Sequence, residues 1–145
     1  MKRPIVINFI IGIGIFTVVA VALYWIIWFT VPEIIQARHP EAHDYLIYVN
    51  FEQVFTLADG WLAVTALVGV LGLWKMRDWG FLFMLLAESA AIFLGLMDFL
   101  YDLQHNMFVH FISEAGIGLI IVLLLLILGP LEIFLLWRQH RLFIY

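Results

Sequence analysis

Residues 4–31 read PIVINFIIGIGIFTVVAVALYWIIWFTV and contain no charged side chain. A helix needs about 20 consecutive apolar residues to cross the hydrocarbon core of a bilayer, so this stretch is long enough to span a membrane with some tilt. A signal peptide is the alternative interpretation, because Lys2 and Arg3 precede the stretch. We prefer the spanning helix, since a signal peptide has an apolar core of roughly 7–15 residues and an A-x-A-like cleavage site.

Three further apolar stretches follow and predict spans over about residues 48–74, 79–101 and 108–137. The chain is 66% hydrophobic and 12% charged, whereas a soluble domain is roughly half apolar and a quarter charged. A soluble fold of 145 residues could not hide so much apolar surface from water. We therefore expect an all-α fold, an integral membrane four-helix bundle that forms a single transmembrane domain over residues 1–145. Short connections predict that consecutive helices are antiparallel neighbours.

The basic residues predict the orientation of this bundle. Cytoplasmic loops of membrane proteins are enriched in lysine and arginine. With four spans, only Arg38 falls on one side, and six basic residues fall on the other: Lys2, Arg3, Lys75, Arg77, Arg138 and Arg141. We therefore expect a multi-pass protein of the plasma membrane with both termini in the cytoplasm. The lipid bilayer is its expected partner, a homo-oligomer or a larger membrane complex is compatible with it, and no nucleic acid is expected.

Acidic residues lie inside the predicted spans, where a charged side chain is costly and is a functional candidate by default. At about 100° per residue, Glu52 and Asp59 share one face of the second span. Asp59 and Glu88 each lie roughly 15 Å from an end of their spans, near the midplane of a core about 30 Å thick. The proton- or cation-binding candidates are Asp59, Glu88, Glu52, Asp98, Asp102 and Glu114.

Each group of acids also has a structural interpretation. Asp59 and Glu88 can be a structural pair, hydrogen-bonded across helices to Thr56, Thr65, Ser89 or Gln53. Asp98, Asp102 and Glu114 can be a solvated helix end. Ala87, Ala91 and Gly95 recur at every fourth residue, and small residues at this spacing predict close helix packing in lipid.

Histidines gather on the side opposite the basic residues. They are His39, His43, His105 and His110, and only His140 lies on the predicted cytoplasmic side. Imidazole and carboxylate together can bind a divalent metal, so Asp102, His105 and His110 are candidate metal ligands. No motif with fixed metal-ligand spacing is present, and the sequence requires no cofactor. The absence of cysteine excludes disulfides and thiolate metal sites.

The segment from Ala58 to Met107 resembles a family of small, uncharacterised four-span prokaryotic membrane proteins. The resemblance rests on Ala58-Asp59-Gly60, on a short basic turn that ends in Trp79-Gly80, and on a helix closing with Asp98-x-x-x-Asp102-x-Gln104-His105. It covers about a third of the chain. It implies the four-helix architecture and a role for the patch of Asp98, Asp102 and Gln104, and it implies no activity.

Three functional interpretations remain open from the sequence. In the first, the protein is a proton- or cation-responsive transporter or accessory subunit that uses its intramembrane carboxyl groups. In the second, it is a membrane enzyme acting on a lipid-like substrate, either with a metal bound by His105, His110, Asp102, Asp98 or Glu114 or by acid–base chemistry of a carboxyl pair. In the third, it is a structural subunit of a membrane assembly. The lack of a catalytic motif favours a role other than catalysis and leaves the enzyme question open.

Overall fold

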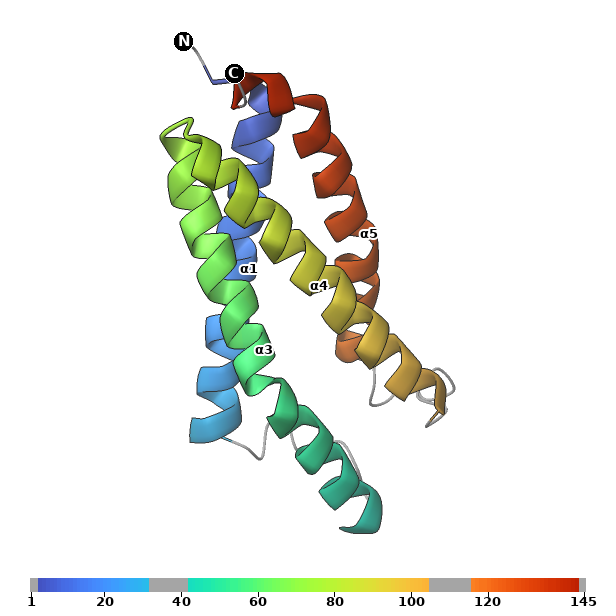
Figure 1. The fold of residues 1–145 in the computed structure, drawn as a ribbon. Helices are drawn as coiled ribbons and strands as arrows, with labels where there is room; N and C mark the ends of the chain where they lie inside the picture. The colour runs from blue at the N-terminus through green and yellow to red at the C-terminus, as the bar shows by residue number, and fades with distance from the viewer. Residues whose placement is uncertain (1–2, 32–41, 105–115, 144–145) are drawn as a thin grey trace.

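The structure is a computed structural model that describes residues 3–31, 42–104 and 116–143. The described part is all-helical and contains four long helices, which we number as in Figure 1. They are α1 (Ile5–Thr30), α3 (Ala42–Trp74), α4 (Asp78–Gln104) and α5 (Gly116–Arg138), followed by the short 3-10 helix η3 (His140–Leu142). Each long helix contains a segment that is long and apolar enough to cross a membrane. The predicted all-α fold with four such helices is therefore confirmed.

One helix is longer than its predicted span. Three predicted spans agree with their helices to within a few residues wherever the structure describes them. The second predicted span, over about residues 48–74, agrees with the apolar segment Val49–Trp74, but the helix α3 itself begins earlier, at Ala42. The additional turns carry charged and polar residues, so hydropathy alone did not include them. A helix can continue past the apolar segment that crosses the bilayer, because its backbone hydrogen bonds do not depend on lipid.

The helices pack in a chain of neighbours, with α1 along α3, α3 along α4 and α4 along α5 (Figure 1). Glycine permits the closest approach, between α3 and α4. A Cβ atom at Gly72 would lie 2.2 Å from the Cα atom of Gly80, and a Cβ atom at Gly69 would lie 2.8 Å from the backbone nitrogen of Met84. Side chains at these positions would force the two helices apart.

A tight turn joins α3 to α4. Met76 has a φ angle of 51°, in the left-handed region that residues with a side chain rarely occupy. The Met76 N–H donates to the Leu73 carbonyl at 3.0 Å, and the Arg77 N–H donates to the Gly72 carbonyl at 2.9 Å. This pair of bonds is the Schellman motif that closes many helices. The Trp79 N–H then donates to Oδ1 of Asp78 at 2.9 Å, at the start of α4.

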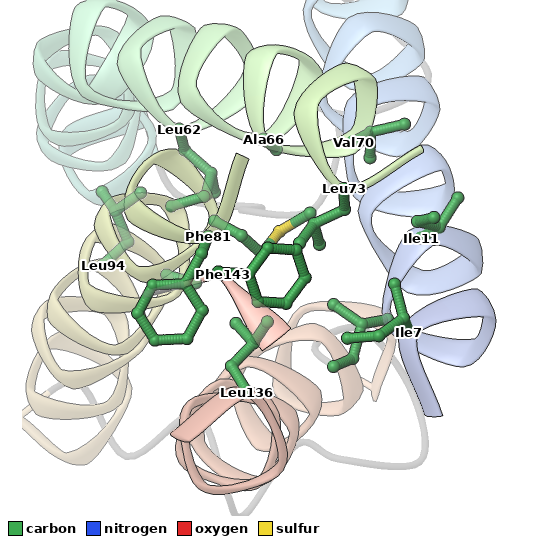
Figure 2. Packing of buried hydrophobic residues seen from close by; sticks show 14 of the residues in the cluster. Ile7, Ile11, Leu62, Ala66, Val70, Leu73, Phe81, Leu94, Leu136 and Phe143 are labelled. Atoms are coloured by element: carbon green, nitrogen blue, oxygen red, sulfur yellow. The ribbon is translucent and has the colours of Figure 1, made fainter. Parts of the chain in front are cut away.

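One end of the bundle holds a well-packed apolar core (Figure 2). Ile7 of α1, Leu73 of α3 and Leu136 of α5 are fully buried there. At the same end the rings of Phe81 and Phe143 stack with their centroids 5.6 Å apart. These contacts bring the described beginnings of α1 and α4 to the ends of α3 and α5.

The outer surface of the helices is also apolar. Leu57 is 87% exposed, Ile5 is 83% exposed and Phe93 is 61% exposed. Exposed apolar side chains on this scale are unusual for a soluble monomer and are typical of a surface that another apolar medium covers. By contrast, the small residues that recur at every fourth position of α4 are buried; they are Ala87, Ala91 and Gly95. A Cβ atom at Gly95 would meet Leu125 of α5 at 3.0 Å, so this stripe serves close helix packing.

Candidate functional site

Two consecutive aromatic residues of α1 hold two acids of α3. The Trp25 indole donates from Nε1 to Oδ2 of Asp59 at 3.0 Å. The Tyr24 hydroxyl donates to Oε2 of Glu52 at 3.0 Å. Glu52 and Asp59 are both directed toward α1, as their predicted common face requires. These two bonds satisfy polar groups of α1 and α3 at the same time.

Ring contacts hold the two donors in position. The Tyr24 and Trp25 rings meet edge to face with their centroids 5.3 Å apart, and the Trp25 and Trp28 rings do so at 5.8 Å. Edge-to-face arrangement is a favoured geometry for aromatic pairs. Trp28 is 1% exposed, so the aromatic group is anchored in the protein interior. The orientation of the Trp25 N–H is therefore restrained by packing as well as by Asp59.

Acids of α4 complete this group. Asp98 is half-buried, and the charges of Glu52, Asp59 and Asp102 all act on it. No basic group is among the interactions that reach Asp98 from the described residues. We call Tyr24, Trp25, Glu52, Asp59, Asp98 and Asp102 the aromatic–carboxyl cluster. It joins three helices and brings three carboxyl groups close enough to act on the fourth, that of Asp98.

A second group of acids joins α4 to α5. Glu88 is 7% exposed and Glu132 is 0% exposed. Their carboxyl groups interact with each other. Within the described residues, however, neither side-chain oxygen of Glu132 has a hydrogen-bond partner of acceptable geometry. The Glu88–Glu132 pair is therefore a buried, close and incompletely satisfied arrangement of two acids.

The two groups lie at different depths. Along their helix axes, Glu88 and Glu132 each lie within about 5 Å of the midpoint of their apolar segments, Asp78–Gln104 and Leu119–Arg138. Both are displaced from the midpoint toward the end of the bundle where Phe81 meets Phe143. Asp98 lies about 10 Å from the midpoint of its segment, on the opposite side.

The sequence left open whether Asp59 and Glu88 form a pair. In the structure Asp59 interacts with Trp25 and Asp98, whereas Glu88 interacts with Glu132. These acids thus belong to two separate groups. The sequence could not decide this, because a depth estimate fixes position along a helix, but helix rotation decides which neighbour a side chain meets.

The partners named in the structural interpretation of these acids bond elsewhere or are exposed. The Thr56 hydroxyl donates to the Gln53 carbonyl at 2.9 Å, within its own helix. The Thr65 hydroxyl donates to the Trp61 carbonyl at 2.8 Å and is also within reach of the Leu62 carbonyl. Hydroxyl groups inside helices often bond in this way to the preceding turn. The side chains of Gln53 and Ser89 are exposed.

The predicted metal ligands can be placed only in part. His105, His110 and Glu114 lie outside the described residues, and Asp102 belongs to the aromatic–carboxyl cluster. Over residues 3–31, 42–104 and 116–143, no group of three or more histidine, cysteine or acidic side chains has an arrangement suited to a metal ion. A metal site formed by Asp102, His105 and His110 stays a prediction.

Three residues of these groups were missed by reasoning from the sequence. Tyr24 and Trp25 lie near the end of an apolar span, where aromatic residues ordinarily serve as interfacial anchors. Glu132 lies inside the fourth predicted span, over about residues 108–137, but was not included among the candidate acids. A depth estimate would have found it, since it lies six residues before Arg138, about 9 Å along the helix.

We compared the chain with protein-family models, curated proteins and solved structures. The chain matches no protein-family model, no curated protein and no solved structure. The resemblance of residues 58–107 to a four-span membrane protein family therefore stays a prediction. The interpretation of the site rests on the chemistry of its own residues.

Proposed function

We propose that the chain is a multi-pass protein of the plasma membrane, with antiparallel neighbouring helices and both termini in the cytoplasm. Four sufficiently long apolar helices and their exposed apolar surface support the membrane location. The orientation is supported by the basic residues, because Arg3, Lys75, Arg77, Arg138 and Arg141 all lie at helix ends or just beyond them. No lysine or arginine lies in the interior of a predicted span.

We further propose that the protein binds protons or cations through the carboxyl groups inside its bundle, as a transporter or an accessory subunit. The observation that carries this proposal is the surroundings of Asp98, on which the charges of Glu52, Asp59 and Asp102 all act. Charges of one sign at close range oppose one another, and they do so more strongly where water is excluded. Uptake of a proton or a cation relieves this repulsion.

The proposal assigns separate roles to the parts of the aromatic–carboxyl cluster. Trp25 and Tyr24 donate hydrogen bonds to Asp59 and Glu52 and so hold these two carboxyl groups in place. Asp98 receives charge repulsion from three carboxyl groups, and a proton or cation added at Asp98 relieves this repulsion. Neutralising Asp98 should therefore change the response to pH or to salt more than neutralising an isolated acid.

Trp25 provides a built-in reporter for the test. We would follow the tryptophan fluorescence of the reconstituted protein while the pH is lowered, and again while sodium, potassium or calcium is added. We expect a transition that is absent from Trp25→Phe and altered in Asp98→Asn. Asp78→Asn is the matched control, because Asp78 is exposed and its side chain accepts a hydrogen bond from the neighbouring backbone N–H of Trp79. A transition that is identical in Asp98→Asn and wild type would contradict the proposal.

A structural role is the second candidate, and one observation favours it. The bonds from Tyr24 and Trp25 join α1 to α3, so Glu52 and Asp59 contribute to holding the helices together. In a purely structural subunit, Asp59→Asn would lower stability and the fluorescence would respond to neither protons nor cations. In a proton- or cation-binding protein, Asp98→Asn would fold normally and change that response.

A further inference from the structure

We infer that Glu88 and Glu132 form a proton-binding site between α4 and α5, in which the two carboxyl groups hold one proton between them. This inference rests on the proposed function and adds to it a second site, its ligand and a residue, Glu132, that was not among the predicted candidates. The site is separate from the aromatic–carboxyl cluster, since no interaction joins either glutamate to Asp59 or Asp98.

Burial makes two charges at this site untenable. Glu132 is 0% exposed and both of its oxygens lack hydrogen-bond partners among the described residues. An ionised carboxylate removed from water without such partners costs several kcal/mol. A protonated carboxyl group is a hydrogen-bond donor as well as an acceptor, so one proton allows one glutamate to donate to the other. That arrangement gives one of the two orphaned Glu132 oxygens a partner among the groups already in place.

No basic residue can take the place of the proton. Among the described residues of α1, α3, α4, α5 and η3, the only charged group that acts on Glu132 is Glu88, and the reverse also holds. The nearest basic residues along α5 are Arg138 and those beyond it. The Arg138 guanidinium lies over the Phe134 ring, 5.9 Å from its centroid, and forms no ion pair with either glutamate.

The geometry favours a proton over a metal ion. Divalent cations such as Ca²⁺ take about six to eight oxygen ligands, and two carboxyl groups supply at most four oxygens. The helices are also in close contact beside the pair: a Cβ atom at Gly129 would lie 2.7 Å from Cγ1 of Ile92 and 3.4 Å from the Glu88 carbonyl oxygen. A proton needs no additional space and no further ligands.

The site also links proton binding to helix packing. Glu132 lies one helical turn after Gly129, where α5 touches the backbone of α4 at Glu88. Loss of the shared proton would leave two like charges facing each other across this contact. We therefore expect the α4–α5 contact to loosen when the site is deprotonated, whereas the α3–α4 contact at Gly72 and Gly80 does not depend on it.

Infrared spectroscopy of the full-length protein in lipid bilayers tests the site, because the C=O stretch of a protonated carboxyl group is separate from the bands of a carboxylate. At neutral pH we expect a protonated-carboxyl band in the wild type. The glutamate part of this band should be lost in the double variant Glu88→Gln/Glu132→Gln, which keeps the shape of both side chains. It should remain in Asp59→Asn/Asp98→Asn.

A labelling experiment without substitutions covers the case in which the double variant does not fold. Carbon-13 in the glutamate carboxyl groups shifts the band if it belongs to glutamate and leaves it in place if it belongs to aspartate. An unshifted band, or the same band in the double glutamine variant, overturns the inference. A band that appears only after sodium and potassium are removed also overturns it and assigns an alkali cation to the site.

The two proposals fail in different ways. Loss of the infrared band only in the glutamine variant, with no change in the fluorescence response of Asp98→Asn, would retain the glutamate site and reject the role of Asp98. A change in the fluorescence response of Asp98→Asn without a glutamate band in the infrared spectrum would retain the role of Asp98 and reject the glutamate site.

Discussion

Replacing Gly80 by alanine tests the closest helix contact in the bundle. A Cβ atom at Gly80 would lie 2.2 Å from the carbonyl carbon of Gly72, 2.3 Å from the nitrogen of Leu73 and 2.5 Å from Cα of Gly72. Carbon atoms pack at about 3.5–4.0 Å, so α3 and α4 would have to separate by about 1 Å or more. The obstructing atoms are all backbone and cannot move aside by a side-chain rotation.

The expected magnitude follows from two opposing terms. Overpacking costs about 1–3 kcal/mol, while alanine favours a helix interior over glycine by up to about 1 kcal/mol. The helix term is smaller at Gly80, which lies in the first turn of α4. We therefore expect the free energy of unfolding of Gly80→Ala to fall by about 1–2 kcal/mol.

The assay is unfolding in a mild detergent, followed by the helical circular dichroism signal. Gly60→Ala is the control, because Gly60 lies inside α3 and a Cβ atom there would meet nothing within 4 Å. This control should be as stable as the wild type or gain up to about 1 kcal/mol. If Gly80→Ala proves as stable as Gly60→Ala, the reasoning about the α3–α4 contact is wrong.

Two further predictions concern the turn and the aromatic–carboxyl cluster. Met76→Gly should raise the free energy of unfolding by about 0.5–1 kcal/mol, because glycine adopts the left-handed conformation of residue 76 without the penalty of a side chain; a loss of stability in the same unfolding assay would refute this. Trp25→Phe should lower the free energy of unfolding by about 1–3 kcal/mol, because the substitution removes the donor to Asp59 and leaves a half-buried carboxyl group unsatisfied. Trp137→Phe is the matched control, since Trp137 is 61% exposed, and equal effects of the two substitutions would argue against the bond.

The fold could be predicted largely from hydropathy, and the limits of that prediction are physical. Apolar stretches of spanning length indicated the four helices, since the backbone N–H and C=O groups of a chain in lipid must bond to each other, as they do in a helix. The start of α3 at Ala42 could not be found in this way, because a helix can extend into water with polar residues. The left-handed conformation of Met76 could not be predicted either, since glycine or asparagine is the usual residue just past a helix end.

The candidate site could be predicted only as a set of residue types. Spacing correctly placed Glu52 and Asp59 on one face of a helix, because seven residues make almost two turns. It could not show that Trp25 faces Asp59 or that Glu88 faces Glu132, since these pairs depend on the rotation of one helix against another. That rotation is set by packing details such as the glycine contacts at Gly129, whose effect appears only in three dimensions.

Every functional proposal here requires that the helices cross a membrane, and the absence of cysteine from the chain makes a direct measurement practical. Single-cysteine variants at Asp78, at Gln139 and at Phe93 would be labelled in intact membranes with a thiol reagent that cannot cross the bilayer. Phe93 is 61% exposed and lies about 3 Å from the midpoint of its apolar segment. We predict that Asp78→Cys and Gln139→Cys react from the cytoplasmic side only, and that Phe93→Cys reacts from neither side until the membrane is dissolved and the protein is unfolded. Rapid labelling of Phe93→Cys in intact membranes would show that this face meets water and would contradict the account.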